Sequence, residues 1–248
     1  MGDRNRAHRA PRTAVVWSVL RAELSRRAAE GPLHVVDAGG GTGGFAVPLA
    51  EAGHRVTVVD ASPDALAALS RRAAEKGVAD RVEAVQGDAD SLLDVAGPAS
   101  ADLVLCHSLL EVVDDPAAAV GSVAAILRPG GCASVLVANR AAAVISRALG
   151  GHFTAASAAL ADPDGRTGPN DTVLRRFDAA SAEALLAKAG LAVEQIHGVR
   201  VVADLVPGAL LDTEPGALDA LLALELAAAD QPPYRDLATQ LHLLARRA

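Results

Sequence analysis

The stretch from Val35 to Phe45, VVDAGGGTGGF, constrains the fold more than any other part of the chain. A short β-branched run ends at the acidic residue Asp37, and glycine then fills five of the six positions from Gly39 to Gly44. This pattern is typical of a buried parallel strand that turns sharply into a helix. Because glycine has no Cβ atom, such a turn also lets a ligand approach the backbone closely. The stretch therefore predicts a nucleotide-cofactor loop.

The rest of the chain alternates β-rich runs with Ala/Leu-rich helical runs, which is the pattern of a parallel sheet with right-handed crossovers. We expect the last strand to return antiparallel beside the sixth and to form a reversed hairpin at the sheet edge. The expected strands are residues 35–37, 55–59, 82–86, 102–106, 133–138, 192–202 and 242–245. The sequence predicts an α/β fold with a seven-stranded, mostly parallel sheet.

The length of 248 residues and the hydrophobic share of 51% fit a single domain, residues 1–248, with a large core. We expect two additions to this domain. Residues 1–30 form a basic helical arm, with its helix over residues 13–29. Residues 139–178, which include the turn-rich run ADPDGRTGPND, form an insertion over the active-site end.

Charge and cysteine content restrict the partners and the compartment. The net charge of −7 argues against a broad nucleic-acid-binding surface, although seven arginines in residues 1–30 leave a local basic arm. We expect no membrane span and no signal peptide. Cys106 and Cys132 are expected at opposite ends of neighbouring strands, about 20 Å apart, and therefore unbridged. Free thiols of this kind predict a cytoplasmic protein.

Two cofactor templates fit the glycine loop. Asp37-x-Gly39-x-Gly41-x-Gly43 is the pattern of S-adenosylmethionine-binding proteins, whereas Gly39-x-Gly41-x-x-Gly44 satisfies the dinucleotide fingerprint. Asp60, at the end of the second strand, suits both, because its carboxylate can accept hydrogen bonds from ribose hydroxyls.

A nicotinamide-dependent dehydrogenase often uses a tyrosine with a lysine four residues later. Tyr234 is the one tyrosine of the chain, and the two lysines are Lys76 and Lys188, so this pair does not occur. The sequence therefore favours S-adenosylmethionine over a nicotinamide dinucleotide as the cofactor.

Four ordered motifs, DAGGGTG at 37–43, VVD at 58–60, CHSLLEVVDDP at 106–116 and LRPGG at 127–131, resemble those of class I S-adenosylmethionine-dependent methyltransferases. Further features resemble the tRNA carboxymethoxyuridine methyltransferase family, which esterifies a carboxylate on a modified wobble uridine. These features are Asp3-Arg4-Asn5, Arg12, Gly198-Val199-Arg200-Val201, Leu224-Glu225 and Gln231-x-Pro233-Tyr234.

The resemblance implies a doubly wound, Rossmann-like methyltransferase fold that binds S-adenosyl-L-methionine. It implies that Arg12 grips the methionine carboxylate, that Asp60 holds the ribose and that His107 lies beside the cofactor. The full set of expected cofactor-binding residues is Arg12, Asp37, Gly39, Gly40, Gly41, Asp60, Asp88, Ala89, Asp90 and His107.

No metal and no catalytic residue beyond positioning groups is expected. A carboxylate acceptor, with an unperturbed pKa near 4, is ionised at pH 7 and needs no general base. It needs a cationic holder, since a guanidinium binds a carboxylate through paired hydrogen bonds. Arg200 is the first candidate, and the remaining candidates for the acceptor site are Arg140, Arg175, Arg176 and Tyr234.

The acceptor itself stays open. The tRNA family has a lysine-rich run where this chain has ADPDGRTGPND, and it has a longer segment before the arginine that corresponds to Arg12. Aromatic residues, which stack unpaired bases, make up only 2% of the chain. A small-molecule O- or N-methyltransferase is therefore the alternative, and a non-catalytic cofactor-binding subunit is a further one. The sequence makes no prediction of the oligomeric state.

Overall fold

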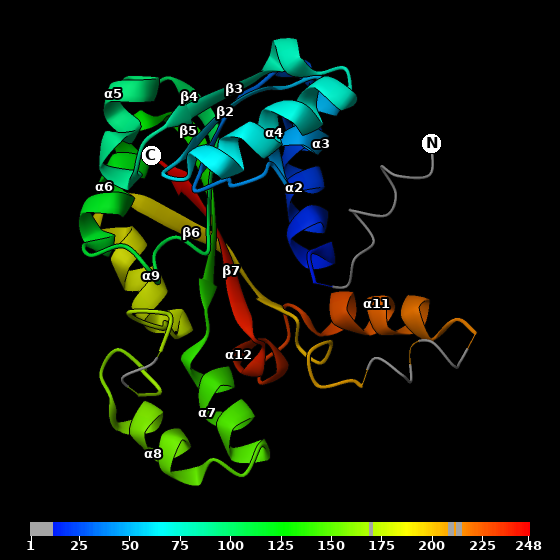
Figure 1. Cartoon of the computed structure of the whole chain (residues 1–248), viewed down its shortest axis with the longest axis vertical. Helices are drawn as coiled ribbons and strands as arrows, with labels where there is room; N and C mark the ends of the chain where they lie inside the picture. Colours follow the sequence, from blue (N-terminus) through cyan, green and yellow to red (C-terminus); the bar gives the residue numbers. More distant parts are fainter. Residues whose placement is uncertain (1–11, 169–170, 208–210, 212–214) are drawn as a thin grey trace. The chain divides into compact units, whose positions relative to one another are not determined.

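A computed structural model describes residues 12–168, 171–207, 211 and 215–248. The Asp3-Arg4-Asn5 motif lies outside these residues. The chain forms a seven-stranded sheet of order β3-β2-β1-β4-β5-β7-β6 (Figure 1). Its strands are β1 (His34–Ala38), β2 (Arg55–Asp60), β3 (Val82–Gln86), β4 (Ala101–His107), β5 (Leu127–Ala138), β6 (Leu191–Val199) and β7 (Gln240–Arg247).

Parallel pairing joins β3 to β2, β2 to β1, β1 to β4 and β4 to β5. The final strands form the predicted antiparallel C-terminal hairpin. The doubly wound, mostly parallel sheet that the sequence predicted is therefore confirmed. Since β1 to β4 are parallel, their carboxyl ends meet at one edge, where ligands of such sheets bind.

Helices connect the strands. They are α2 (Ala14–Arg26), α3 (Ala46–Glu51), α4 (Pro63–Glu75), α5 (Leu92–Ala96), α6 (Pro116–Ile126), α7 (Arg140–Leu149), α8 (Phe153–Ala161), α9 (Ala179–Lys188), α11 (Ala217–Ala228) and α12 (Tyr234–Leu237). Short 3-10 turns are η1 (Ala28–Glu30), η2 (Ala79–Arg81) and η3 (Ala89–Ser91). The predicted helix over 13–29 is thus α2 followed by η1.

Two helix starts show how the sequence fixes the loops at the carboxyl edge. Ser62 caps α4 by accepting a hydrogen bond from the Ala65 amide at 3.2 Å, and Pro63 follows it. Asp115 caps α6 through the amides of Ala117 and Ala118. Such caps satisfy amides that have no partner inside the helix.

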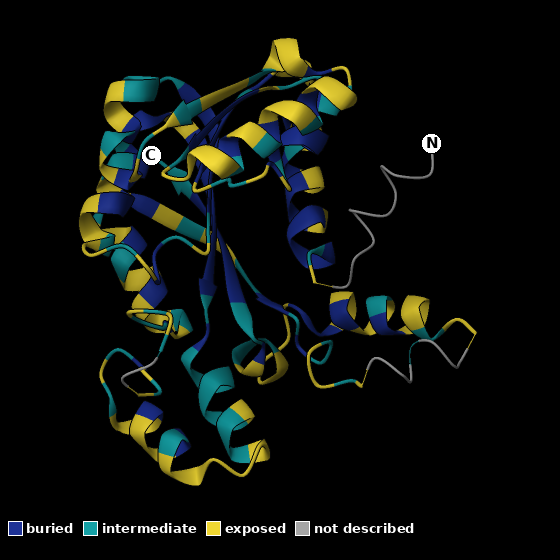
Figure 2. Cartoon of the chain, in the orientation of Figure 1, coloured by how far each residue is buried: buried dark blue, intermediate teal, exposed yellow. Residues whose placement is uncertain are grey.

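The chain divides into two compact units. Unit 2 comprises Ser25–Leu136, Glu183–Glu194 and Leu243–Ala248, and unit 1 comprises the described residues of Met1–Leu24, Val137–Ala182 and Gln195–His242. In unit 2, α3 and α4 lie on one side of the strands and α5 and α6 on the other (Figure 1). β1, β2 and β4 are mostly buried, whereas the edge strand β3 and the outer surfaces of the helices are largely exposed (Figure 2).

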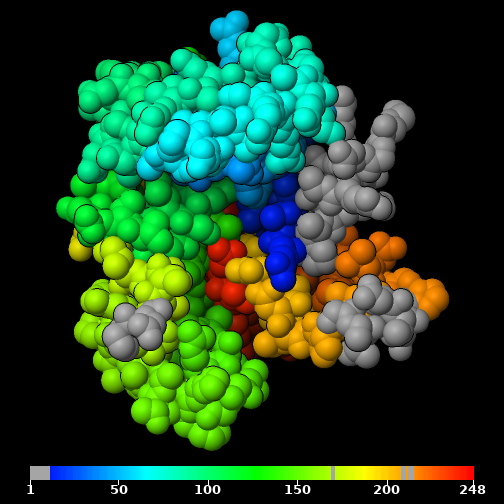
Figure 3. Space-filling model, viewed as in Figure 1, coloured from blue at the N-terminus to red at the C-terminus, as the bar shows by residue number. Residues whose placement is uncertain are grey.

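Unit 1 contains the segment 139–178. Here α7 and α8 pack against each other, and their residues form one continuous part of the surface in Figure 3. Asn139 anchors the segment, because its side chain donates to the carbonyls of Asp236 and Ala238 and accepts from the amide of Ala141. That the whole chain is one domain, with 139–178 covering the active site, stays a prediction.

Cys106 and Cys132 are buried and unbridged, as expected. The expected separation of about 20 Å is too large, however. Cys132 pairs with Leu103, so the two cysteines are offset by three residues, or about 10 Å along the strands. The error arises because β5 begins at Leu127 rather than at residue 133. This offset still exceeds the reach of a disulfide.

Within the described residues, no helix is long and apolar enough to cross a membrane.

Candidate functional site

The glycine loop joins β1 to α3 in unit 2. Gly39, Gly41 and Gly43 have φ angles of +70°, +55° and +78°, a left-handed conformation that residues with a Cβ atom rarely adopt. The Gly39 amide donates to the carbonyl of Val59 at 2.7 Å, which holds the start of the loop against the end of β2. The alternation of glycines in the sequence therefore has a direct backbone cause.

Gly40 has a different requirement. A Cβ atom at this position would lie 2.5 Å from Cγ of Asp37 and 2.9 Å from Cγ1 of Val58. The backbone thus packs directly against the buried Asp37 side chain, which is 3% exposed. Burial, together with the negative charge of Asp60, raises the pKa of Asp37 to about 7.

Asp60 links the glycine loop to the start of α4. One carboxylate oxygen accepts the Gly41 amide at 2.8 Å, and the other accepts the Ser62 amide at 2.9 Å. Each carboxylate oxygen has two lone pairs, so both can accept a second hydrogen bond. The carboxylate can therefore hold the loop and still receive ribose hydroxyls.

Asp88 caps η3, a role that sequence reasoning missed. Its Oδ1 atom accepts the amides of Asp90 and Ser91, each at 3.1 Å, while the Asp88 amide donates to the Ser91 hydroxyl at 3.0 Å. This reciprocal arrangement is a capping box. The Asp88 carboxylate thus has a structural task in addition to its expected role at the adenine.

A cavity of about 360 Å³ lies at the carboxyl ends of β1 to β4 in unit 2. It brings together four of the expected cofactor residues: Gly39, Asp60, Asp88 and Ala89. Asp37, Gly40, Gly41, Asp90 and His107 do not line it. Gly40 and Gly41 still belong to the loop that shapes its edge.

Apolar side chains complete the walls of this cavity. They include Leu92, Leu109, Val112 and Val113, which sequence reasoning did not single out. Leu109, Val112 and Val113 belong to the CHSLLEVVDDP motif, and their position after the fourth strand was the available signal. A cavity with apolar walls and a few carboxylates suits a nucleoside, whose base packs on aliphatic groups and whose sugar needs acceptors.

His107 ends β4. Its Nε2 atom lies 2.8 Å from the Ser134 hydroxyl oxygen, and its ring packs edge-on against Phe45 with centroids 4.7 Å apart. Burial lowers the pKa of His107 to about 3, so the imidazole is neutral at pH 7. It can orient neighbouring groups, but it is a weak base. The prediction that it lies beside the cofactor remains a prediction.

Unit 1 contains a second cavity, of about 290 Å³. Among the described residues that line it, Arg147, Arg176 and Arg200 are basic and Asp204 is acidic, so this part of the lining carries an excess of positive charge. Arg176 forms an ion pair with Asp171, and Arg147 donates to the hydroxyl of Thr167, which is neutral. This cationic cavity contains two of the predicted acceptor-site residues, Arg200 and Arg176.

Arg200 is unusual in two respects. Its φ angle is +60°, which is rare for a residue with a long side chain. Its Nη1 atom lies 3.2 Å from Asp204, whereas its buried Nε atom has no hydrogen-bond partner among the described residues. A buried donor without a partner costs free energy that a bound acceptor atom can recover.

The other predicted acceptor-site residues are not brought to this cavity. Arg140 donates to the carbonyls of Leu160 and Pro163 and so holds the chain after α8. Tyr234 begins α12 and is 53% exposed, and Arg175 is outside the lining.

Arg12 is 74% exposed and lies 3.8 Å from Asp204 within unit 1. Its contact with the methionine carboxylate of a cofactor stays a prediction.

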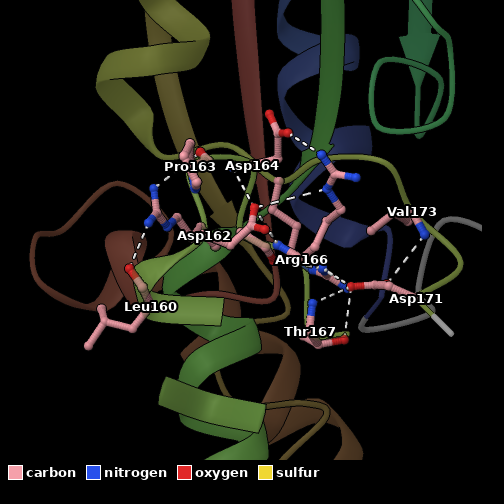
Figure 4. A network of polar contacts seen from close by, with 11 residues as sticks. Leu160, Asp162, Pro163, Asp164, Arg166, Thr167, Asp171 and Val173 are labelled. Carbon is pink, nitrogen blue, oxygen red and sulfur yellow. Dashed lines mark hydrogen bonds and ion pairs between the residues drawn. The ribbon is translucent and has the colours of Figure 1, made fainter. Parts of the chain in front are cut away.

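The turn-rich run within 139–178 satisfies its own charges (Figure 4). Asp171 accepts from the amide and hydroxyl of Thr167, from the Val173 amide and from both ends of the Arg176 guanidinium. The Arg176 guanidinium is the largest cause that holds the pKa of Asp171 well below its usual range. The Asp171 carboxylate is therefore bound by groups of the protein itself.

Unit 2 thus has the parts of an adenosine-cofactor site: a glycine loop, a carboxylate at the end of β2 and an apolar cavity beside them. When bound, S-adenosylmethionine supplies a methyl group on a sulfonium. The hydrogen-bonding capacity left on Asp60 and the apolar walls of the cavity fit such a group. Together, fold and site define a class of Rossmann-like enzymes that bind an adenosine-containing cofactor at the carboxyl edge of the sheet.

Comparison with known proteins identifies the family. A methyltransferase-domain family model matches residues 35–131. The chain is 32% identical to the tRNA 5-carboxymethoxyuridine methyltransferase of Escherichia coli (strain K12) over 238 residues, which is 95% of this chain and 88% of the relative. It is 31% identical to the ubiquinone biosynthesis O-methyltransferase of Xylella fastidiosa (strain 9a5c), covering 71% of this chain and 68% of that protein.

Among solved structures, an S-adenosylmethionine-dependent methyltransferase from Mesorhizobium loti has the same fold, with a TM-score of 0.62 and 23% identity over 96% of this chain and 100% of that one. The chain belongs to the S-adenosylmethionine-dependent methyltransferase family. Both the fold and the cofactor class that the sequence predicted are therefore confirmed.

Proposed function

We propose that this protein methylates the carboxylate of a carboxymethoxyuridine-type wobble nucleoside in tRNA. The tRNA 5-carboxymethoxyuridine methyltransferase of Escherichia coli aligns over 95% of the chain, which includes most of unit 1. The cytoplasm, where tRNA is modified and used, is the compartment that this reaction requires.

The observation that carries the proposal is the cationic cavity with Arg200 in its wall. A carboxylate accepts charge-assisted hydrogen bonds, which are about twice as strong as those between neutral groups. Arg200 has an unsatisfied Nε–H, and Arg147 and Arg176 add positive charge beside it. This donor set suits an anionic acceptor better than a neutral one.

The chemistry asks little else of the protein. An ionised carboxylate oxygen forms the new O–CH₃ bond while the methyl–sulfur bond breaks, so no proton is transferred. The residues have to orient the acceptor and exclude water, and orientation alone can lower a barrier by about 7–11 kcal/mol. The lowered pKa of His107, to about 3, is compatible with this scheme because no base is used.

A small-molecule O-methyltransferase is the second candidate, because a ubiquinone-biosynthesis enzyme aligns with 71% of the chain. A phenolic acceptor has an unperturbed pKa near 10 and must lose its proton before or during transfer. Burial lowers the pKa of His107, at the carboxyl end of β4, which makes it a poorer base. This chemistry favours the carboxylate.

The decisive experiment is mass spectrometry of tRNA nucleosides from a strain that lacks the gene. We expect the methyl ester to disappear and the free acid to accumulate. When the purified protein is incubated with tRNA from this strain and S-adenosylmethionine, the ester should be restored. An unchanged nucleoside profile would refute the tRNA acceptor and favour the small-molecule alternative.

A variant pair tests the cavity. Arg200→Ala should lower kcat/KM for the tRNA acceptor by about 100-fold, in line with the loss of a charge-assisted pair. The affinity for S-adenosylmethionine should stay within twofold. Arg166→Ala is the control, since Arg166 is an exposed arginine paired with Asp164 outside the cavity lining. Equal losses for acceptor and cofactor would remove Arg200 from the acceptor site.

A further inference from the structure

Glu225 is a fully buried acid on α11, with 0% exposure. Its carboxylate accepts hydrogen bonds from three consecutive backbone amides: Oε2 accepts Val201 at 2.8 Å, and Oε1 accepts Val202 at 2.8 Å and Ala203 at 2.7 Å. Consecutive amides that converge on one anion form a concave anion-binding nest. The three amides thus give both carboxylate oxygens of Glu225 a hydrogen-bond partner.

These three amides follow Arg200 directly in the chain. The Arg200 carbonyl accepts the amide of Thr239 at 3.2 Å. Strand β6 ends at Val199, one residue before Arg200. Arg200 is therefore held between a strand end and a loop clamped by Glu225. Nothing local favours its φ of +60°, which costs about 1 kcal/mol or more in a residue that has a Cβ atom.

We infer that Glu225 is the positioning residue for the acceptor site: by clamping the amides of Val201, Val202 and Ala203, it holds Arg200 in the left-handed conformation that directs its guanidinium into the cationic cavity. The inference rests on the proposed function, because it assigns Arg200 to the acceptor. Asp204, four residues after Arg200, sits at the far end of the same clamped loop and holds the guanidinium through Nη1.

A carboxylate is needed for this task because both of its oxygens accept. Glutamine has nearly the same shape, but its amide nitrogen is a donor. In Glu225→Gln, that nitrogen would face either the Val201 amide or the amides of Val202 and Ala203, donor against donor. The clamp would lose at least one of its three hydrogen bonds while the packing around it stayed nearly the same.

The test compares Glu225→Gln with Asp219→Asn, which makes the same charge change at an exposed position of the same helix. The substrate is tRNA from a strain lacking the methyltransferase gene, and cofactor affinity is measured by calorimetry. Glu225→Gln should raise KM for this tRNA and lower kcat/KM about 10- to 100-fold, with S-adenosylmethionine affinity within twofold. Asp219→Asn should change neither.

A double-mutant cycle separates positioning from general stability. If Glu225 acts through Arg200, then Glu225→Gln costs nothing further in kcat/KM on an Arg200→Ala background. A loss that adds to that of Arg200→Ala, or a parallel loss of cofactor affinity, overturns the inference. If Glu225→Gln does not fold, Glu225→Asp, which keeps both acceptor oxygens on a shorter side chain, enters the same cycle.

The two proposals fail differently. An Arg200→Ala variant with unchanged acceptor kinetics overturns the assignment of the acceptor site itself. A large Arg200→Ala effect that is additive with Glu225→Gln overturns only the positioning role.

Discussion

Within the glycine loop, individual glycines are needed for different physical reasons. Gly40 lies where a Cβ atom would overlap Asp37 and Val58, whereas a Cβ atom at Gly44 would meet nothing within 4 Å. Gly44 also lacks the positive φ angle of Gly39, Gly41 and Gly43. These glycines look alike in the sequence. Their different requirements follow from the packing and the backbone conformation in the structure.

We therefore expect Gly40→Ala to weaken S-adenosylmethionine binding by at least about tenfold and to lower the free energy of unfolding by about 1–3 kcal/mol, the usual cost of overpacking. Gly44→Ala should leave both unchanged, which makes it a matched control one turn away. Calorimetry and urea unfolding measure the two quantities. Equal behaviour of the two variants would contradict the packing argument.

A second prediction for a single residue concerns the affinity of an Asp60 variant for S-adenosylmethionine. Asp60→Ala removes both the expected ribose acceptor and the hydrogen bonds to the amides of Gly41 and Ser62. We expect S-adenosylmethionine affinity to fall at least about 100-fold, since several hydrogen bonds to a charged group are lost together. Asp64→Ala, an exposed acid in the first turn of α4, is the control. Wild-type affinity in Asp60→Ala would refute the cofactor assignment.

The raised pKa of Asp37 predicts that the free energy of unfolding depends on pH. Its folded-state pKa of about 7 lies above the ordinary value of 3.8, so the unfolded chain loses this proton first as pH rises. Its contribution to stability is therefore greatest below about pH 4 and is lost as the pH rises to about 7. In Asp37→Asn this trend should vanish.

The free energy of unfolding of the wild type should fall relative to Asp37→Asn by up to about 4 kcal/mol between pH 4 and pH 7. Chemical denaturation at several pH values measures this difference. The exposed Asp94→Asn variant should follow the wild-type profile. A difference between wild type and Asp37→Asn that is constant with pH would contradict the raised pKa.

At the scale of elements, the turn-rich loop after α8 is held by its own ion pairs. The Asp171 side chain is 5% exposed and receives five hydrogen bonds, whereas Asp164 is 45% exposed and pairs with the exposed Arg166. Buried and exposed pairs in one loop thus offer a direct comparison.

Asp171→Asn should lower hydrogen-exchange protection of the Thr167 and Val173 amides by about 10- to 100-fold, because a buried guanidinium loses its charged partner. Asp164→Asn should change protection by less than about threefold, as expected for an exposed pair. Similar effects of the two variants would show that the loop is not organised around Asp171.

Strands and helices were largely predictable, because alternation and caps are local signals. The end of β6 was not: the sequence suggested a strand through residue 202, but it stops at Val199 because the next amides bind Glu225, 22 or more residues farther along the chain. The glycine loop between β1 and α3 was predictable for the same local reason. The apolar wall formed by Leu92, Leu109 and Val112 depends on tertiary packing and was missed.

At the scale of the whole molecule, charge limits how tRNA can be held. The net charge is −7, and the described arginines of the 139–178 segment mostly bind the protein's own carboxylates, carbonyls and hydroxyls. We therefore expect recognition through one pocket with few phosphate contacts. Two such contacts to an unpaired loop would give a salt slope of about −1.4.

Raising the salt from 50 mM to 200 mM should then increase KM for tRNA less than about tenfold. Steady-state kinetics at several salt concentrations measure the slope. A slope that indicates six or more phosphate contacts would mean that a broad basic surface binds the tRNA.

The bond between the Asp60 carboxylate and the Gly41 amide has a kinetic consequence. Since the protein itself already supplies this contact, the glycine loop does not have to find its shape during the encounter with the cofactor. The entropy of ordering the loop is spent at folding and not at each catalytic cycle. We therefore expect S-adenosylmethionine to bind in a single bimolecular step, without a preceding rearrangement of the glycine loop that limits the rate.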